Sequence, residues 1–290
     1  MRHHVRSQRC TRPVMALLAV ITAAAAGCAG STTTERTTDQ ILQGLQHGLL
    51  GHASQQETLT LAAEGPIDVE VRNFAGDVVV RADHQSRHRD VQVELTRRAT
   101  HEAGRTKESE ASLPQITWSA EVVPPSVPDG VPTLVVTSAT THGEPWFQRL
   151  EVEILADQVR TVTVNTTRGR VMVFDNRGPV DIHTTKGDVR VVTPWPQTEP
   201  STIVTKDGSI DWRVRGESTG LVDADTVGGK VMVRCEAGRW VATDRANDLD
   251  TLVATLNGGT NRITLRTVDG DIRVGVTGDP HATGSFAVGP

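Results

Sequence analysis

The sequence has few aromatic residues and no tyrosine. Phe, Trp and Tyr together make up 3% of the 290 residues. A large core therefore cannot depend on aromatic side chains and must be built from aliphatic ones. Valine, isoleucine and threonine recur through most of the chain, and these β-branched residues favour strands. The composition predicts an all-β protein with an aliphatic core.

Cysteine is also scarce. The chain has three, Cys10, Cys28 and Cys235. We expect Cys10 to leave with an export signal and Cys28 to carry a lipid. Cys235 would then have no partner, which excludes a fold held by internal disulfides. It lies in the strand-like run VMVRC, where we expect a small structural residue.

No apolar run is long enough to cross a membrane as a helix. Residues 14–26 are apolar or small, whereas a spanning helix needs about 20 residues. Four arginines and no acidic residue precede this run, as in a cleaved signal peptide. Ala25-Ala26-Gly27-Cys28 resembles the bacterial lipobox, in which the cysteine is acylated, although leucine is commoner where Ala25 stands. We expect a lipoprotein of the bacterial cell envelope, anchored to the membrane through Cys28; an ordinary cleaved signal is the alternative.

The charge balance argues against nucleic acid as a partner. The whole chain has 30 basic and 35 acidic residues. Loss of the four signal-peptide arginines leaves 26 against 35, a net charge of −9. A surface of this sign repels phosphate backbones.

Composition divides the chain into four parts. Residues 1–27 are the expected signal peptide, and residues 28–56 are the lipidated cysteine and a flexible Thr-rich tether. Residues 57–276 are the expected β-strand repeat domain, and residues 277–290 are a Gly/Pro-rich tail. Residues 100–112 contain the one ordered helix expected in the domain.

A short unit recurs through the second half of the domain. It consists of Thr or Asn, one or two polar residues, Gly, a polar residue, and then Val/Ile-x-Val/Ile. Its glycines are spaced by 9, 9, 21, 21 and 41 residues, and Gly258-Gly259 is a further candidate in the last gap. The copies are TTRGRVMV (166–173), DNRGPVDI (175–182), TTKGDVRV (184–191), TKDGSIDW (205–212), TVGGKVMV (226–233) and TVDGDIRV (267–274).

The unit has a simple physical interpretation. Glycine permits the positive φ or close approach that a corner needs. Val-x-Val places two branched side chains on one face of a strand, and Thr or Asn can bond local backbone groups. Because one short strand buries little, stacked copies are needed. We predict a right-handed β-solenoid, similar to a β-helix, with a less regular amino-terminal β portion; an antiparallel meander is the alternative.

The order of these features resembles a known family. NFAGDVVVRA (73–82), a short Glu/Ala-rich helix and serial T-x-x-G-x-V-x-V units are similar to the bacterial "putative adhesin" family of β-strand repeat proteins, a domain of unknown function likened to adhesin heads. The resemblance covers about residues 57–276, and a long insertion between about 234 and 257 departs from it. It implies a fold and a location in the envelope, and no catalytic residue can be transferred from it.

Patterns typical of catalytic or metal sites lack the context that they need. Residues 216–220 match G-x-S-x-G, but strand-like sequence on both sides predicts a turn and not the strand-to-helix elbow of a hydrolase. His84, His88 and Asp90 could bind a metal, but they lie in an Arg-containing loop. Lys186-Gly187-Asp188 resembles an integrin-type tripeptide and lies inside a repeat unit, so we discount it.

Acidic residues near the end of the domain could gather on one side of a solenoid. Such carboxylates could bind calcium or flank a glycosidic bond, but solubilising surface charges are the plainer interpretation. The residues are Asp223, Asp225, Asp244, Asp248 and Asp250.

Two tryptophans are the best candidates for contact with a ligand. Trp212 is expected in the core, whereas Trp146 and Trp195 lie in turn-like segments beside prolines, and an exposed indole can stack on a sugar. We therefore expect a non-enzymatic scaffold or adhesin-like binding module, with no catalytic residue, metal or cofactor. Its expected partner, besides the membrane, is a glycan or an envelope protein. The alternatives are a polysaccharide-acting enzyme and an envelope signalling accessory.

Overall fold

The computed structural model describes residues 51–83, 90–102, 104–125, 127–128, 130–244, 249–282, 284 and 286. The signal peptide and Cys28 lie outside these residues, as do His84 and His88. No helix in the described part of the chain is long and apolar enough to cross a membrane.

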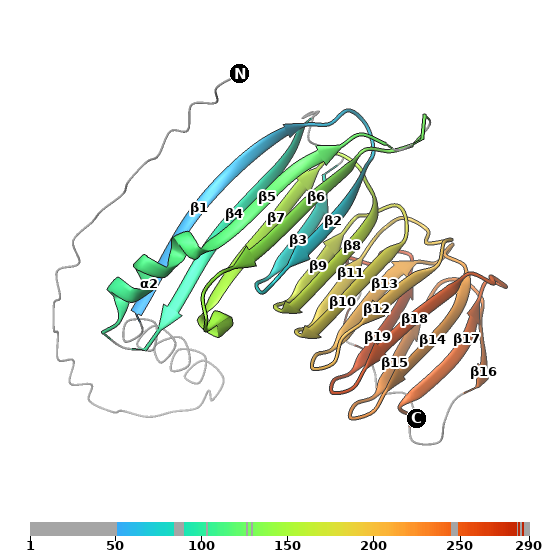
Figure 1. Ribbon diagram of the computed structural model, residues 1–290. Coiled ribbons are helices and arrows are strands. Elements are labelled where there is room, and N and C mark those ends of the chain that lie inside the picture. The colour runs from blue at the N-terminus through green and yellow to red at the C-terminus, as the bar shows by residue number, and fades with distance from the viewer. Residues whose placement is uncertain are drawn as a thin grey trace, which may run out of the picture. The chain divides into compact units, whose positions relative to one another are not determined.

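Two β-sheets form the domain (Figure 1). In spatial order, the described strands of the first sheet are β1 (Gly51–Ala62), β4 (Asp90–His101), β7 (Gln148–Ala156), β3 (Val78–Ala82), β9 (Val171–Phe174), β11 (Val189–Val192), β13 (Ile210–Arg215), β19 (Ile272–Thr277) and β15 (Val231–Cys235). Those of the second sheet are β16 (Trp240–Asp244), β17 (Thr251–Leu256), β14 (Gly220–Thr226), β18 (Arg262–Thr267), β12 (Ser201–Val204), β10 (Val180–Lys186), β8 (Val159–Arg168), β2 (Ile67–Asn73), β6 (Thr133–Thr140) and β5 (Ile116–Val123).

Each coil of the repeat places one strand in the second sheet and the next strand in the first. Thus β8 leads into β9, β10 into β11, and β12 into β13. Strands of neighbouring coils pair in parallel in both sheets. The predicted all-β, solenoid-like repeat is therefore confirmed, while its right-handed sense stays a prediction.

The coils do not stack in the order of the chain. The coil β6–β7 lies before β2–β3, and β18–β19 is inserted between β12–β13 and β14–β15. The insertion expected between about 234 and 257 contains β16 and β17, which pair antiparallel beyond β14. At the opposite end, β4 and β1 continue the first sheet and β5 the second, also antiparallel. Antiparallel pairing, the alternative considered for the whole domain, is thus confined to the ends.

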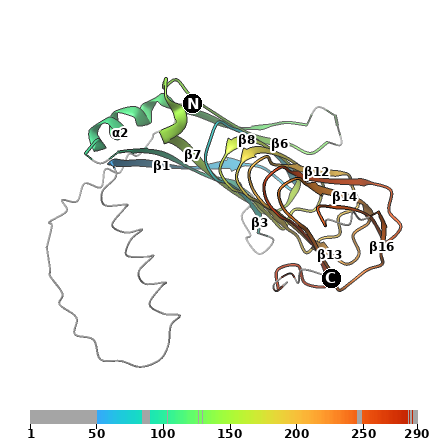
Figure 2. The same cartoon turned by 90° about the horizontal axis from the view of Figure 1, so that it is seen from below.

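The coils are seen along the stack in Figure 2. An aliphatic core fills the space between the two sheets. Alternate residues of each strand are buried, as in β8 and β14, because successive side chains of a strand point to opposite faces. Trp212 is buried in this core, as predicted, and Trp118 and Trp240 pack partly against it.

Stacked glycines form the corner at which the chain passes from the second sheet to the first. A Cβ atom on Gly169 would lie 2.2 Å from the carbonyl oxygen of Gly76, and one on Gly187 only 2.0 Å from that of Gly169. The contact repeats at every coil, and φ is +120° at Gly169 and +147° at Gly187. Only glycine tolerates both the approach and the conformation. In spatial order this column consists of Gly76, Gly169, Gly187, Gly208, Gly270 and Gly229.

At four of the column glycines, the Thr or Asn three residues earlier bonds to the neighbouring coil, whereas the Thr166 hydroxyl donates to Arg168 within its own turn (3.3 Å). The Thr205 hydroxyl donates to the Gly187 carbonyl (3.1 Å), and that of Thr267 donates to the Gly208 carbonyl (2.8 Å). The Asn73 amide donates likewise to Leu150 (2.9 Å). The bonds expected within one turn thus also join successive coils. Thr184 differs, because its buried hydroxyl has no partner among the described groups.

One of the six predicted units belongs to the opposite corner. Gly178 precedes β10, a strand of the second sheet, and its N–H donates to Arg160 (3.0 Å). Gly258-Gly259 likewise precedes β18. The spacing of 9 residues is therefore half a coil, and Gly169 and Gly187 are one coil apart.

Short helical segments connect some of the strands. The helix expected within residues 100–112 is α2 (Thr106–Ser112), followed by the 3₁₀ turn η1 (Leu113–Gln115); a second turn, η2 (Pro145–Phe147), precedes β7. The tether predicted to reach residue 56 was too long, because β1 begins at Gly51. The first residues of β1 pair with the end of β4, which explains why the ordered strand begins before residue 57.

Replacing a column glycine should destabilise the domain strongly. In Gly270→Ala the new Cβ would lie 2.3 Å from the Gly208 carbonyl oxygen, at φ +148°. We expect the free energy of unfolding in urea to fall by about 2–4 kcal/mol. Gly143→Ala is the matched control, since that Cβ would meet nothing within 4 Å. Equal stability of the two variants would contradict the role of the column.

Candidate functional site

The serine of the G-x-S-x-G pattern is structural. Ser218 is fully buried in the turn between β13 and β14. Its Oγ accepts the backbone N–H of Gln197 (2.9 Å). The predicted turn is therefore correct, and no substrate could reach this hydroxyl without unfolding of the turn.

Of the five acidic residues near the end of the domain, Asp223 and Asp225 are engaged by arginines, while Asp248 lies outside the described residues. Asp223 lies 2.6 Å from both Arg262 and Arg266, and Asp225 lies 3.8 Å from Arg266. Burial alone would raise the pKa of Asp223, but hydrogen bonds from the two arginines outweigh it and hold that pKa below its ordinary value. Among the described residues, no group of three or more His, Cys, Asp or Glu could hold a metal ion.

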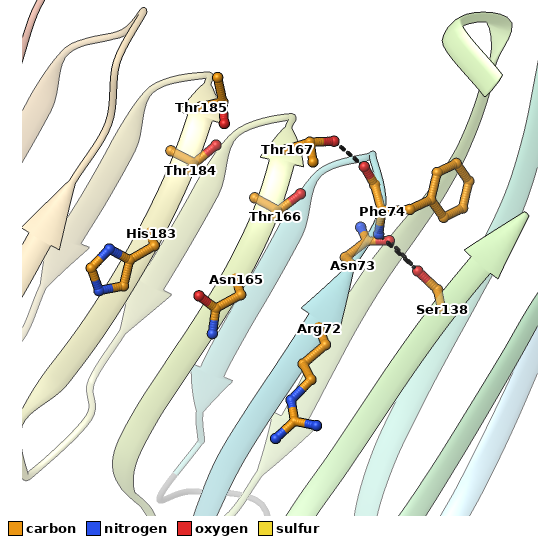
Figure 3. Close-up of a pocket in the computed structure, with 10 residues that line it drawn as sticks. All are labelled: Arg72, Asn73, Phe74, Ser138, Asn165, Thr166, Thr167, His183, Thr184 and Thr185. Carbon is orange, nitrogen blue, oxygen red and sulfur yellow. Dashed lines mark hydrogen bonds between the residues drawn. The ribbon is translucent and has the colours of Figure 1, made fainter. Parts of the chain in front are cut away.

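Three connected hollows follow the glycine corner. The first, of about 430 Å³, lies over the outer face of the second sheet. Figure 3 shows Arg72, Asn165 and His183 across three neighbouring strands there, with Phe74 beyond them at the corner. The second hollow (about 660 Å³) shares Phe74 with the first, and the third (about 600 Å³) lies on the far side of the corner. We call them together the corner groove.

Trp146, Arg168 and Lys186 line both the second and the third hollow. Trp146 is 59% exposed, which agrees with its predicted position at the surface. Its ring meets Phe147 edge to face, with centroids 5.5 Å apart. Arg168 donates to the carbonyls of Pro145 (2.7 Å) and Gln148 (3.2 Å). The turn η2 that presents the indole is thus fixed on both sides.

Trp195 does not share this surface. It lies between β11 and β12, where the chain passes from the first sheet to the second, whereas Trp146 lies on the reverse connection. The Trp195 ring is half-buried, and the Arg177 guanidinium lies 4.1 Å from its centroid. The two tryptophans named from the sequence therefore do not form one ligand-facing surface.

The cations of the corner groove were missed in the sequence. In the sequence, Lys186 stands out only as part of the Lys-Gly-Asp tripeptide, and Arg168 belongs to no motif that indicates a ligand. Both immediately precede a column glycine, and they are register partners across β8 and β10. A comparison of the residue before each glycine would have found them, once the units at Gly169 and Gly187 were known to be one coil apart.

A family match is consistent with this geometry. Residues 149–275 match the family described as "Toastrack DUF4097". The match confirms the predicted resemblance over this part of the chain. The matched region extends from β7 to β19 and supplies Arg168 and Lys186, while Phe74 and Trp146 precede it. The corner groove thus joins the matched region to the strands before it.

Solved structures show a looser likeness. A "putative cell adhesion protein" from Clostridium sporogenes is 8% identical, with 77% of this chain and 100% of that chain covered and a TM-score of 0.48. A "putative adhesin" from Bacteroides fragilis is 11% identical, with 77% and 97% covered and a TM-score of 0.26. A search of curated proteins found no match.

If Asp223 is structural, its contribution to stability should depend on pH. Because its folded-state pKa lies below the ordinary 3.8, the stability that it contributes is present above that value and lost as the pH falls through the folded pKa. We expect Asp223→Asn to lower the free energy of unfolding by about 1 kcal/mol at pH 7, a value discounted for partial solvation. The loss should shrink at pH 3, as measured by urea unfolding. The exposed Glu217→Gln is the control, and an equal loss at both pH values would refute this role.

Proposed function

We propose that this protein is a lipid-anchored, non-enzymatic binding module of the bacterial cell envelope that holds its ligand in the corner groove. The observation that carries the proposal is Trp146, an exposed indole on a fixed turn between two open hollows. An aromatic surface of this kind is suited to a sugar ring or an apolar protein side chain.

The acids of the corner groove favour binding over hydrolysis. Asp77 and Asp207 are its carboxylates. Asp77 accepts the backbone N–H and the guanidinium of Arg170 (2.9 and 2.6 Å). A glycosidase needs one carboxyl to donate a proton and a second to act as base or nucleophile. Asp77 lines the third hollow and Asp207 the second, so none of the three hollows is lined by two described carboxylates that could share one glycosidic bond.

The anchor supports a location in the envelope. The lipobox-like Ala25-Ala26-Gly27-Cys28 follows an apolar run too short to span a membrane. A tether after Cys28 would hold the repeat domain at the membrane surface.

Loss of Cys28 should release the protein. We expect the wild type in the membrane fraction of expressing cells and Cys28→Ala in the soluble fraction, because acylation needs the thiol. Protease treatment of intact cells then reports which side the domain faces. Membrane retention of Cys28→Ala would refute the lipid anchor.

Loss of the Trp146 indole should weaken ligand binding. On immobilised bacterial envelope polysaccharides and envelope proteins, we expect Trp146→Ala to bind its ligand about tenfold more weakly, since an aromatic contact contributes about 1 kcal/mol or more. Trp195→Ala is the matched control and should bind like the wild type. If the Trp146 variant binds as tightly as the wild type, the corner groove is not the binding site.

A further inference from the structure

The corner groove is cationic although the protein is acidic. Its lining contains Arg72, Arg149, Arg168, Arg170 and Lys186, and the carboxylates of its described lining are Asp77 and Asp207. Glu70, Glu151 and Asp77 form ion pairs with Arg72, Arg149 and Arg170, so the positive charge of the groove comes from Arg168 and Lys186. The whole chain has a net charge of −5. A cluster of positive charges on a negatively charged protein attracts anionic ligands to that place.

Arg168 carries much of this uncompensated charge. Its guanidinium is bonded to two backbone carbonyls, and no carboxylate forms an ion pair with it among the described residues. Burial, followed by repulsion from Arg149, lowers the pKa of Arg168. A partly buried guanidinium of this kind is stabilised by any anion that enters the groove.

Lys186 continues the positive row on the next coil. It is the register partner of Arg168 on one side and of Asp207 on the other. Its side chain is exposed and forms no ion pair within the described part of the chain. Neighbouring strands lie about 4.8 Å apart, so Arg168 and Lys186 present two cations at the spacing of the coils.

The remaining lining is suited to a sugar polymer. Hydroxyls of Ser138, Thr167 and Thr185 line both the first and the second hollow. Ser138 and Thr167 donate to Asn73 and Phe74, so they can only accept from sugar hydroxyls, whereas Thr185 can donate as well. The groove crosses the coils from η2 to Asp207, four steps of about 4.8 Å. This length fits an extended chain better than a single small molecule.

We propose that the corner groove selects acidic glycans: the Trp146 indole supports a sugar ring, while Arg168 and Lys186 bind the carboxylate or phosphate groups of the polymer. The inference rests on the proposed binding function and adds to it the charge of the ligand. A neutral glycan would leave the two cations without a role, and a peptide would leave the row of hydroxyls without sugar partners.

The test compares polygalacturonate with the same polymer after complete methyl esterification, which keeps the sugar backbone and removes the charge. By surface plasmon resonance at low salt, we expect the wild type to bind the acid at least tenfold more tightly than the ester. Binding of the acid should weaken as salt is added. Lys186→Gln should lose severalfold affinity for the acid and none for the ester, while Trp146→Ala should lose affinity for both.

Lys230→Gln is the matched control, because Lys230 is an equally exposed lysine of the repeat that lies outside the groove. It should bind like the wild type. Equal binding of acid and ester, still dependent on Trp146, would overturn the acidic preference and leave the proposed function standing. If polyaspartate binds as tightly as polygalacturonate, charge alone accounts for the binding, and the role of the sugar ring is overturned.

Two further results would overturn the glycan inference. Tighter binding to phosphatidylglycerol vesicles than to polygalacturonate would assign the cations to lipid headgroups and overturn the inference. If neither polymer binds, the glycan inference fails; the proposed function fails with it only if Trp146→Ala also leaves the binding to envelope proteins unchanged.

Discussion

The close contact between stacked glycines is the constraint on which the structure depends. At each coil the Cα of one glycine lies against the carbonyl of the next, so near that a Cβ on Gly187 would lie 2.0 Å from the Gly169 oxygen. Backbone hydrogen bonds run along the same corner, as from Gly187 N–H to the Asp207 carbonyl (2.8 Å). The corner cannot shift along the strand, so the register of both sheets follows from it. The apolar residues two and four positions after each column glycine therefore point toward the core.

The same column positions the corner groove. Residues that precede equivalent glycines are brought into line across the coils, so Arg168 and Lys186 become neighbours although 18 residues separate their glycines. The groove therefore needs no long specialised loop. Its one addition to the repeat is η2, which places Trp146 at the end of the row and is held there by Arg168.

The ends of the stack show how the fold limits its own growth. A parallel coil stack leaves unpaired strand edges, which can recruit other chains. Here β18–β19 is inserted before the last coil, and β16 and β17 pair antiparallel beyond β14; β4, β1 and β5 do the same at the other end. Of these strands, β16 and β17 lie in the insertion that departs from the repeat in the sequence. Their irregularity is what ends the repeat.

The sequence by itself determined the strands, the inward valines, the Thr-x-x-Gly corner and the exposure of Trp146, because each follows from the local preferences of a few adjacent residues. It indicated a repeat but not which unit occupies which corner, since Gly178 and Gly187 look alike until the sheets are known. Only the tertiary structure decided that Gly270 stacks between Gly208 and Gly229, that Trp195 lies on the opposite corner, and that Arg168 and Lys186 share a groove. Coil order and side-chain neighbours depend on pairing between strands far apart in the chain, and many orders satisfy the same local pattern.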